Sequence, residues 1–183
     1  MNFDLSSTAC FTGHRPNGFG PRNKPISEIQ KEISSLLRSA IAYLYDHGYR
    51  TFISGGALGV DQWAAYEVID LRNHDPEVKL VIAKPFPSQD IQWPEHARKE
   101  FEIICDSADE VIDVSPDPYA TWKMHARNSF MVDNSSAVVA VKIPDVMSGG
   151  TASCCAYAER KRKNIIYIDP HQQTINYPNM FEE

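Results

Sequence analysis

Short runs of β-forming apolar residues alternate with longer segments of helical period along this 183-residue chain. Where strands and helices alternate in this way, the helical connections are long enough to make neighbouring strands parallel. The run AVVAVKI is apolar at almost every position, as expected of a strand covered on both faces. The sequence therefore predicts an α/β fold with a doubly wound, mainly parallel sheet and helices on both faces. The six predicted strands occupy residues 8–12, 50–54, 79–86, 109–114, 137–143 and 164–169.

The longest predicted helix follows a glycine- and proline-rich loop over residues 13–25. Gly48 is placed to end this helix in the manner of a C-terminal cap. Apolar residues recur along the helix at the spacing of one buried face. That face consists of Ile29, Ile33, Leu36, Leu37, Ala40, Ile41 and Leu44.

Further helices are predicted after the second, third, fourth and fifth strands. The tail after Pro170 has mixed character and is assigned to no element. No repeat, linker or low-complexity segment divides the chain, so residues 1–183 are predicted to form one domain. The predicted helices span residues 60–72, 94–106 and 119–134, and a last one ends near Lys163.

The charge balance limits the partners that this chain can bind. The net charge is −6 and the isoelectric point is near 5.5. Proteins that neutralise many phosphates are usually basic or carry a dense basic stripe. The only compact basic run, ERKRKN at residues 159–164, is typical of the solvated end of a helix. A nucleic-acid partner is therefore not expected, whereas a small anionic ligand needs only local complementarity.

Composition indicates an ordinary globular protein with neither a metal nor a cofactor. No apolar run approaches the roughly 20 residues that cross a bilayer, and the N-terminus does not resemble a signal peptide, so a cytoplasmic location is expected. Cys10 and Cys105 lie in apolar segments and are interpreted as small buried residues. Cys154 and Cys155 are adjacent, which suits neither a tetrahedral zinc site nor an ordinary disulfide.

Glycine and polar residues follow four of the predicted strands. In open parallel sheets, ligands bind beyond the carboxyl ends of the strands, where the strand order reverses. We therefore expect these four loops to converge on one ligand site. The candidate ligand-binding residues are Thr12, Gly13, His14, Arg15, Ser54, Gly55, Gly56, Ala57, Gly59, Asp61, Lys84, Pro85, Ser148, Gly149, Gly150 and Thr151.

Two of these loops, SGGALGVD and SGGTAS, connect a predicted strand to the start of a predicted helix. Helix N-termini attract anions, and glycines let the backbone approach a ligand. The spacing G-G-x-x-G matches neither the dinucleotide motif nor a Walker A loop, so each loop alone is also compatible with a tight turn. Their combination with TGHR after the first strand favours a backbone anion site at Gly55, Gly56 and Gly59 within a nucleotide pocket.

Charged residues near the loops have two interpretations each. Asp61 lies in the first turn of its predicted helix, where it can cap the helix or accept hydrogen bonds from a ribose or base. Arg127 and Asn128 in the fourth predicted helix are further candidate ligand-binding residues. Arg127 can bind a phosphate or carboxylate bidentately, or form a structural salt bridge.

The motifs TGHRP, SGGALGVDQWAA, HARNSFMVDNS and SGGT together resemble the SLOG superfamily of Rossmann-like proteins, most closely its YpsA-like (DUF1273-type) group. The resemblance covers roughly residues 8–168 and implies a Rossmann-like fold. It also implies a nucleotide or nucleotide-derived ligand, bound across the glycine loops at the carboxyl edge of the sheet. The convergence of these anion-ready loops favours a binding module that senses or sequesters this ligand. Related folds often dimerise, so a homodimer is compatible with the sequence.

Two other SLOG groups imply different functions. The LOG phosphoribohydrolases cleave the N-glycosidic bond of nucleoside monophosphates and carry a helix arginine, which Arg127 matches, before a P-G-G-x-G-T-x-x-E loop. The glutamate of that loop corresponds to Cys154, so a hydrolase is the alternative function, with Asp61, Arg127 and Asp133 as the catalytic candidates. DNA-processing protein A has a similar glycine loop and binds single-stranded DNA, but such binding calls for a basic groove that this acidic chain does not indicate.

Overall fold

In the computed structural model, seven strands form one sheet in the order β4-β3-β2-β1-β5-β6-β7. The structure describes residues 3–19 and 24–178. The first six strands pair in parallel, and β7 pairs antiparallel with β6 at the edge. The strands are β1 (Thr8–Gly13), β2 (Thr51–Ser54), β3 (Lys79–Lys84), β4 (Glu110–Asp113), β5 (Ala137–Val141), β6 (Asn164–Asp169) and β7 (Thr174–Asn176).

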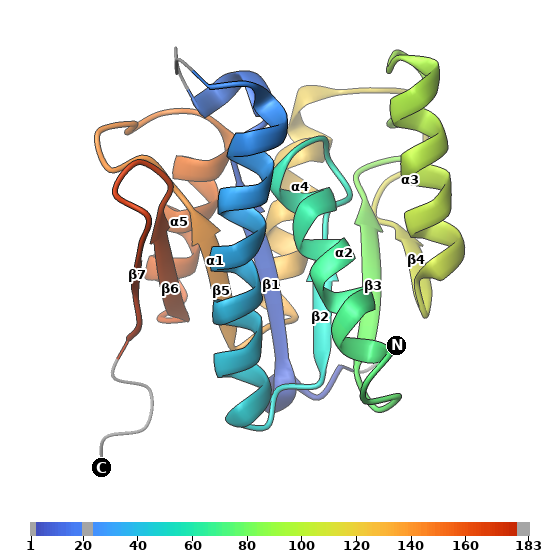
Figure 1. Ribbon diagram of the computed structural model, residues 1–183. Coiled ribbons are helices and arrows are strands. Elements are labelled where there is room, and N and C mark those ends of the chain that lie inside the picture. The colour runs from blue at the N-terminus through green and yellow to red at the C-terminus, as the bar shows by residue number, and fades with distance from the viewer. Residues whose placement is uncertain (1–2, 20–23, 179–183) are drawn as a thin grey trace.

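Five α-helices cover both faces of the sheet (Figure 1). The side chains of α1, α2 and α3 pack into one core cluster, and those of α4 and α5 pack into a second cluster on the opposite face. The prediction of a doubly wound, mainly parallel α/β fold is therefore confirmed. The helices are α1 (Ile26–Asp46), α2 (Val60–Arg72), α3 (Glu95–Ser107), α4 (Thr121–Asp133) and α5 (Gly150–Arg160), with short 3-10 turns η1 (Leu5–Ser7) and η2 (Pro16–Phe19).

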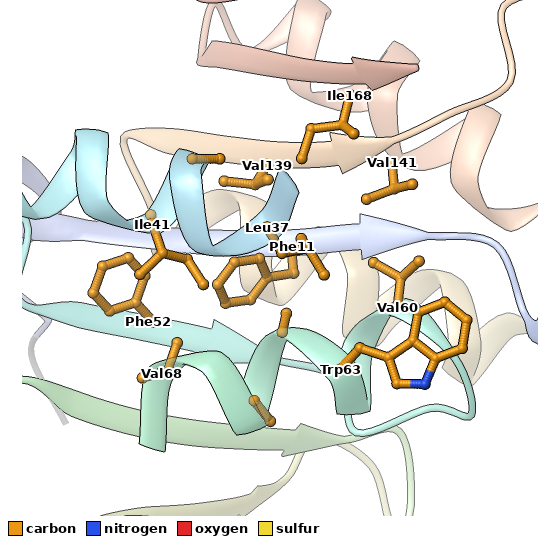
Figure 2. Close-up of a cluster of buried hydrophobic side chains, with 14 of the residues drawn as sticks. Phe11, Leu37, Ile41, Phe52, Val60, Trp63, Val68, Val139, Val141 and Ile168 are labelled. Atoms are coloured by element: carbon orange, nitrogen blue, oxygen red, sulfur yellow. The ribbon is translucent and has the colours of Figure 1, made fainter. Parts of the chain in front are cut away.

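Side chains of β1 alternate between the two core clusters. Phe11 faces α1 and α2 and stacks on Phe52 of β2, with ring centroids 6.1 Å apart (Figure 2). Cys10 faces α4 and α5. Fully burying a side chain such as Phe11 contributes roughly 1.5–3 kcal/mol, so this pairing fixes β1 and β2 beneath the two helices. The predicted apolar face of α1 also lies in this core, with Leu36 only partly buried.

The strand order reverses between β1 and β5. From β1 the chain adds β2, β3 and β4 on one side, whereas β5 returns to the other side of β1 and is followed by β6. The connections after β1 and β5 therefore leave in opposite directions, and their divergence opens a crevice at the carboxyl ends of these two strands. This is the place where the sequence predicts convergence of the ligand loops.

Among the described residues, the edge strand β7 is the one strand that the sequence did not predict. It has three residues, and its Ile175 pairs with Ile168 of β6. A run this short shows no readable period, so only the pairing with β6 defines it as a strand. Within the predicted loop 13–25, η2 forms, and residues 20–23 lie outside the described residues. In the described ranges no helix is long and apolar enough to cross a membrane.

His14 joins the loops that follow β1 and β5. Its Nε2 accepts a hydrogen bond from the Ile143 N–H at 3.3 Å, and its ring lies edge-on to Phe19. A ring nitrogen that accepts must be unprotonated, so His14 is neutral and carries its proton on Nδ1. Burial, with lesser effects of His171 and Lys142 nearby, lowers the pKa of His14 below its ordinary value.

We expect the free energy of unfolding to depend on pH through His14. The unfolded chain takes up this proton first as the pH falls below about 6.5, so the contribution of the hydrogen bond is complete above that pH and is lost progressively below it. Glutamine in His14→Gln cannot titrate. As the pH is lowered, the free energy of unfolding of the wild type, measured in urea, should fall by about 1 kcal/mol more than that of His14→Gln. The exposed His125→Gln serves as control, and equal pH slopes for wild type and His14→Gln would contradict the assignment.

Candidate functional site

A cavity of about 340 Å³ lies at the switch point between β1 and β5. This volume is at the lower end of the range for small-molecule sites. Four segments line the cavity, namely the end of β1 with its loop, the β2–α2 loop with the start of α2, one face of α4 and the start of α5. The lining residues are Phe11, Thr12, Gly13, His14, Arg15, Ala57, Leu58, Asp61, Met124, Arg127, Asn128, Met131, Gly150 and Thr151.

Arg127 is the buried cation of this cavity. It projects from α4, and only 5% of its surface is exposed. Its Nη1 lies 3.3 Å from Oδ2 of Asp61, while its Nε is buried and has no hydrogen-bond partner among the described residues. A buried polar atom without a partner is costly, and a guanidinium can donate to two oxygens at once. Arg127 therefore has spare capacity for an acceptor inside the cavity.

Asp61 supplies the carboxylate of the cavity from the first turn of α2. Besides Arg127, it accepts a hydrogen bond from the Ala57 N–H at 3.3 Å. Burial raises the pKa of Asp61, although Arg127 and the Ala57 N–H act in the opposite direction. Within the described part of the chain, Asp61 is the only acidic residue that lines the cavity. Among the described residues, Asp61 makes no cap hydrogen bond at the start of α2, where Gly59 is the N-cap. Its carboxylate bonds instead to the Ala57 N–H of the preceding loop, and Asp61 lines the cavity.

Several backbone N–H groups of the loop between β2 and α2 donate hydrogen bonds to other atoms of the protein. The Gly56 N–H donates to Ser54 Oγ at 3.2 Å, and the Val60 N–H donates to the His14 carbonyl at 3.4 Å. With the Ala57 N–H on Asp61, these donors are already engaged. Of the predicted anion site at Gly55, Gly56 and Gly59, the Gly56 N–H is therefore already engaged.

Close packing explains the glycines of this loop. A Cβ on Gly55 would lie 1.4 Å from Nη1 of Arg127, and one on Gly56 would lie 2.5 Å from the Phe101 ring. Gly59 has a φ of +94° and approaches the His14 carbonyl, where a Cβ would come within 2.7 Å. A side chain at any of these positions would force its neighbour to move. The glycines let Arg127, Phe101 and the His14 loop pack directly against the backbone.

The loop before α5, which contains Gly149 and Gly150, is less closely packed than the loop before α2. No atom lies within 4 Å of a Cβ built on Gly149 or Gly150. The first turn of α5 begins with the Ser153 N–H donating to the Gly149 carbonyl, so the N–H groups of Gly150 and Thr151 have no acceptor four residues earlier within the helix. Gly150 and Thr151 line the cavity and bring the partial positive charge of the α5 N-terminus to it.

Several predicted site residues lie elsewhere. Lys84 pairs with Asp113 of β4 at 3.0 Å, and Asp133 is exposed, where it pairs with Lys161 and accepts a hydrogen bond from Tyr157. The structure brings neither residue to the cavity, and we do not include them in the site. The other predicted residues that do not line it are Ser54, Gly55, Gly56, Gly59, Pro85, Ser148 and Gly149.

The apolar lining from α4 was not predicted as part of the site. Met124 and Met131 lie one helical turn before and after the Arg127–Asn128 pair. Residues at this spacing share one face of a helix, so the pattern M-x-x-R-N-x-x-M was a readable signal. Cys154, which replaces the LOG glutamate, is buried in the core between α5 and the sheet, and burial raises the pKa of its thiol. It does not line the cavity.

Structural comparison identifies the fold. DNA processing protein A from Helicobacter pylori, whose single-stranded DNA binding mode has been described, superposes with a TM-score of 0.57 at 21% identity over 91% of this chain. DNA processing protein A from Streptococcus pneumoniae superposes with a TM-score of 0.58 at 17% identity over 88% of this chain. This chain spans only 66% and 50% of those two chains. Such distant similarity shows a shared Rossmann-like fold.

Sequence comparison identifies the family. The YpsA model, described as the YspA SLOG family, matches residues 9–173. The uncharacterized SPbeta prophage-derived protein YoqJ of Bacillus subtilis strain 168 is 32% identical over 150 residues, which cover 76% of this chain and 85% of YoqJ. UPF0398 protein YpsA of the same strain is 28% identical over 158 residues, which cover 84% of this chain and 85% of YpsA. The resemblance inferred from the motifs is thus confirmed, and the chain belongs to the YpsA family of SLOG proteins.

Proposed function

We propose that the protein binds a nucleotide-type small molecule in the switch-point cavity, as a module that senses or sequesters it. The observation that carries the proposal is the buried Arg127, which lines the cavity and whose Nε has no hydrogen-bond partner among the described residues. A phosphate oxygen would satisfy this donor, and the N-terminus of α5 would add its partial charge on the same group.

The remaining lining suits the other parts of a nucleotide. Thr12, Asn128 and Thr151 offer hydrogen bonds to a sugar, and Asp61 offers a carboxylate to a ribose hydroxyl. Met124 and Met131 offer adaptable apolar surface for a planar base. Such a combination of apolar walls and a few polar groups is typical of small-molecule sites.

A small molecule is favoured over a nucleic-acid strand. The DNA processing protein A structures share this fold, and for one of them a single-stranded DNA binding mode is described. Strand binding relies on many basic side chains along a groove, whereas this chain carries a net charge of −6. The cations of the cavity, Arg15 and Arg127, are too few to follow a strand but are sufficient for one or two phosphates.

The first test replaces Arg127 by lysine, which keeps the charge but lacks the planar fork of donors. We expect nucleoside 5′-monophosphates, measured by calorimetry, to bind the wild type and to bind Arg127→Lys about tenfold more weakly, a difference of about 1.4 kcal/mol. Arg160→Lys, on α5 away from the cavity, is the matched control, and thermal unfolding checks that each variant is folded. Absence of binding to the wild type across nucleoside mono- and diphosphates would overturn the proposal.

The second test changes no polar group. In Gly55→Ala the new methyl group would occupy the position of the Arg127 guanidinium, which must therefore move. We expect a loss of about 1–3 kcal/mol of stability through overpacking, together with weaker ligand binding as in Arg127→Lys. Urea unfolding and calorimetry measure the two effects. A folded Gly55→Ala protein that binds with wild-type affinity would show that the position of Arg127 is unimportant.

A hydrolase is the second candidate, because the Asp61 carboxylate lies beside Arg127 in the cavity. An oxocarbenium-like transition state needs an ionised carboxylate nearby. If the protein releases free base from nucleoside monophosphates, Asp61→Asn should abolish release, and Asp133→Asn, outside the cavity, should leave it unchanged. The rate should fall as the pH drops through the raised pKa of Asp61. Base release unaffected by Asp61→Asn would eliminate this mechanism.

A further inference from the structure

A second, larger chamber adjoins the cavity on the side of β3 and α3. Its volume is about 790 Å³, and it shares Arg15, Ala57 and Met124 with the inner cavity. Its remaining walls come from the loop after β3 and the segment that leads into α4. Because three residues line both spaces, the outer chamber lies directly beside the inner cavity.

Aromatic rings form the walls of the outer chamber. Phe86 is buried after β3, and its ring meets the ring of Tyr119 edge to face, with centroids 5.8 Å apart. Trp93 is tilted against Phe101, with centroids 5.3 Å apart. Tyr119 remains 64% exposed, so most of its ring is free to contact a ligand. Rings held in this way offer flat surfaces on which another planar ring can stack.

Gln89 places an unsatisfied donor in the same chamber. Its Nε2 is buried and has no hydrogen-bond partner among the residues that the structure describes. The amide lies against Gly56, where a Cβ would come within 3.3 Å of Nε2. Buried amides are normally paired, so a ligand atom that accepts a hydrogen bond would complete this site.

Polar contacts hold the chamber walls in place without a ligand. Ser88 donates to Asp117 Oδ1 from both its hydroxyl, at 2.6 Å, and its backbone N–H, at 3.1 Å. The buried Lys123 donates to the carbonyls of Pro116 and Pro118, each at 2.5 Å. These bonds tie the loop after β3 and the segment before α4 together. The chamber is therefore largely preformed, as ligand sites usually are.

We propose that the outer chamber is a second subsite, which takes a planar ring joined through phosphate to the nucleotide in the inner cavity. The inference rests on the proposed function and narrows its ligand class to phosphate-linked molecules with two ring-bearing ends. The ring stacks among Phe86, Trp93 and Tyr119 and accepts a hydrogen bond from Gln89. Arg15, which lines both spaces, lies where the connecting phosphate passes.

The test compares nucleoside 5′-monophosphates with the corresponding symmetric dinucleoside pyrophosphates by calorimetry. The pyrophosphates should bind the wild type about tenfold more tightly. Tyr119→Ala and Gln89→Leu should remove most of this advantage and leave monophosphate affinity within about twofold, because base–aromatic stacking supplies a substantial free energy per base. Trp122→Ala, at a neighbouring residue that is 60% exposed and does not line the chamber, is the control and should leave both affinities unchanged.

The outcomes separate this inference from the proposed function. The second subsite would be overturned if monophosphates bind but pyrophosphates bind no more tightly. It would also be overturned if the tighter binding of pyrophosphates persists in both Tyr119→Ala and Gln89→Leu. Either result would leave the proposed function standing. No binding of either probe would overturn both. Oligothymidylates that bind more tightly with increasing length and with steep salt dependence would identify a strand ligand and also overturn the two-ended small molecule.

Discussion

The carboxyl end of the sheet depends on close backbone approaches that only glycine permits. A Cβ on Gly13 would lie 2.5 Å from that of Val60, so the end of β1 and the start of α2 touch directly. Gly55 makes the equivalent approach to Arg127 of α4, and Gly59 makes it to the carbonyl of His14. Through these contacts, the start of α2 on one face of the sheet and Arg127 of α4 on the other face both pack against the loops at the carboxyl end of the sheet. The cavity is the space that remains where the strand order reverses.

This packing changes the role of the glycine motif SGGALGVD. The sequence favoured a phosphate cradle in SGGALGVD, yet the N–H groups of Gly56, Ala57 and Val60 donate to Ser54, Asp61 and His14. The loop also packs against Arg127, and further donors lie on that arginine and at the start of α5. Anion recognition in the proposed site thus combines a side chain from α4 with a helix terminus from α5, which belong to the same face of the sheet.

The sequence predicted the sheet because most of its strands are short apolar runs separated by segments of helical period, and this pattern can be read without knowledge of distant contacts. It predicted the cavity in outline because residues that follow parallel strands must gather at one edge. It could not predict which side chains point inward. Lys84 is the last residue of β3 and not part of the loop that follows it, and Asp113 of the neighbouring strand pairs with it. Asp133 lies at the end of α4, more than a turn beyond Arg127, where Lys161 and Tyr157 engage it. Such partners are distant in sequence and leave no periodic signal.

The charges around the cavity limit what it can hold. Arg15 and Arg127 face a single carboxylate, Asp61, and His14 is neutral, so the lining carries one net positive charge. A phosphate at Arg127 would compete with Asp61 for the guanidinium, and its negative charge would raise the pKa of that carboxyl further. Burial already acts in this direction. Anion binding and proton uptake by Asp61 are therefore coupled, and protonation would turn Asp61 from an acceptor that opposes the phosphate into a donor that assists it.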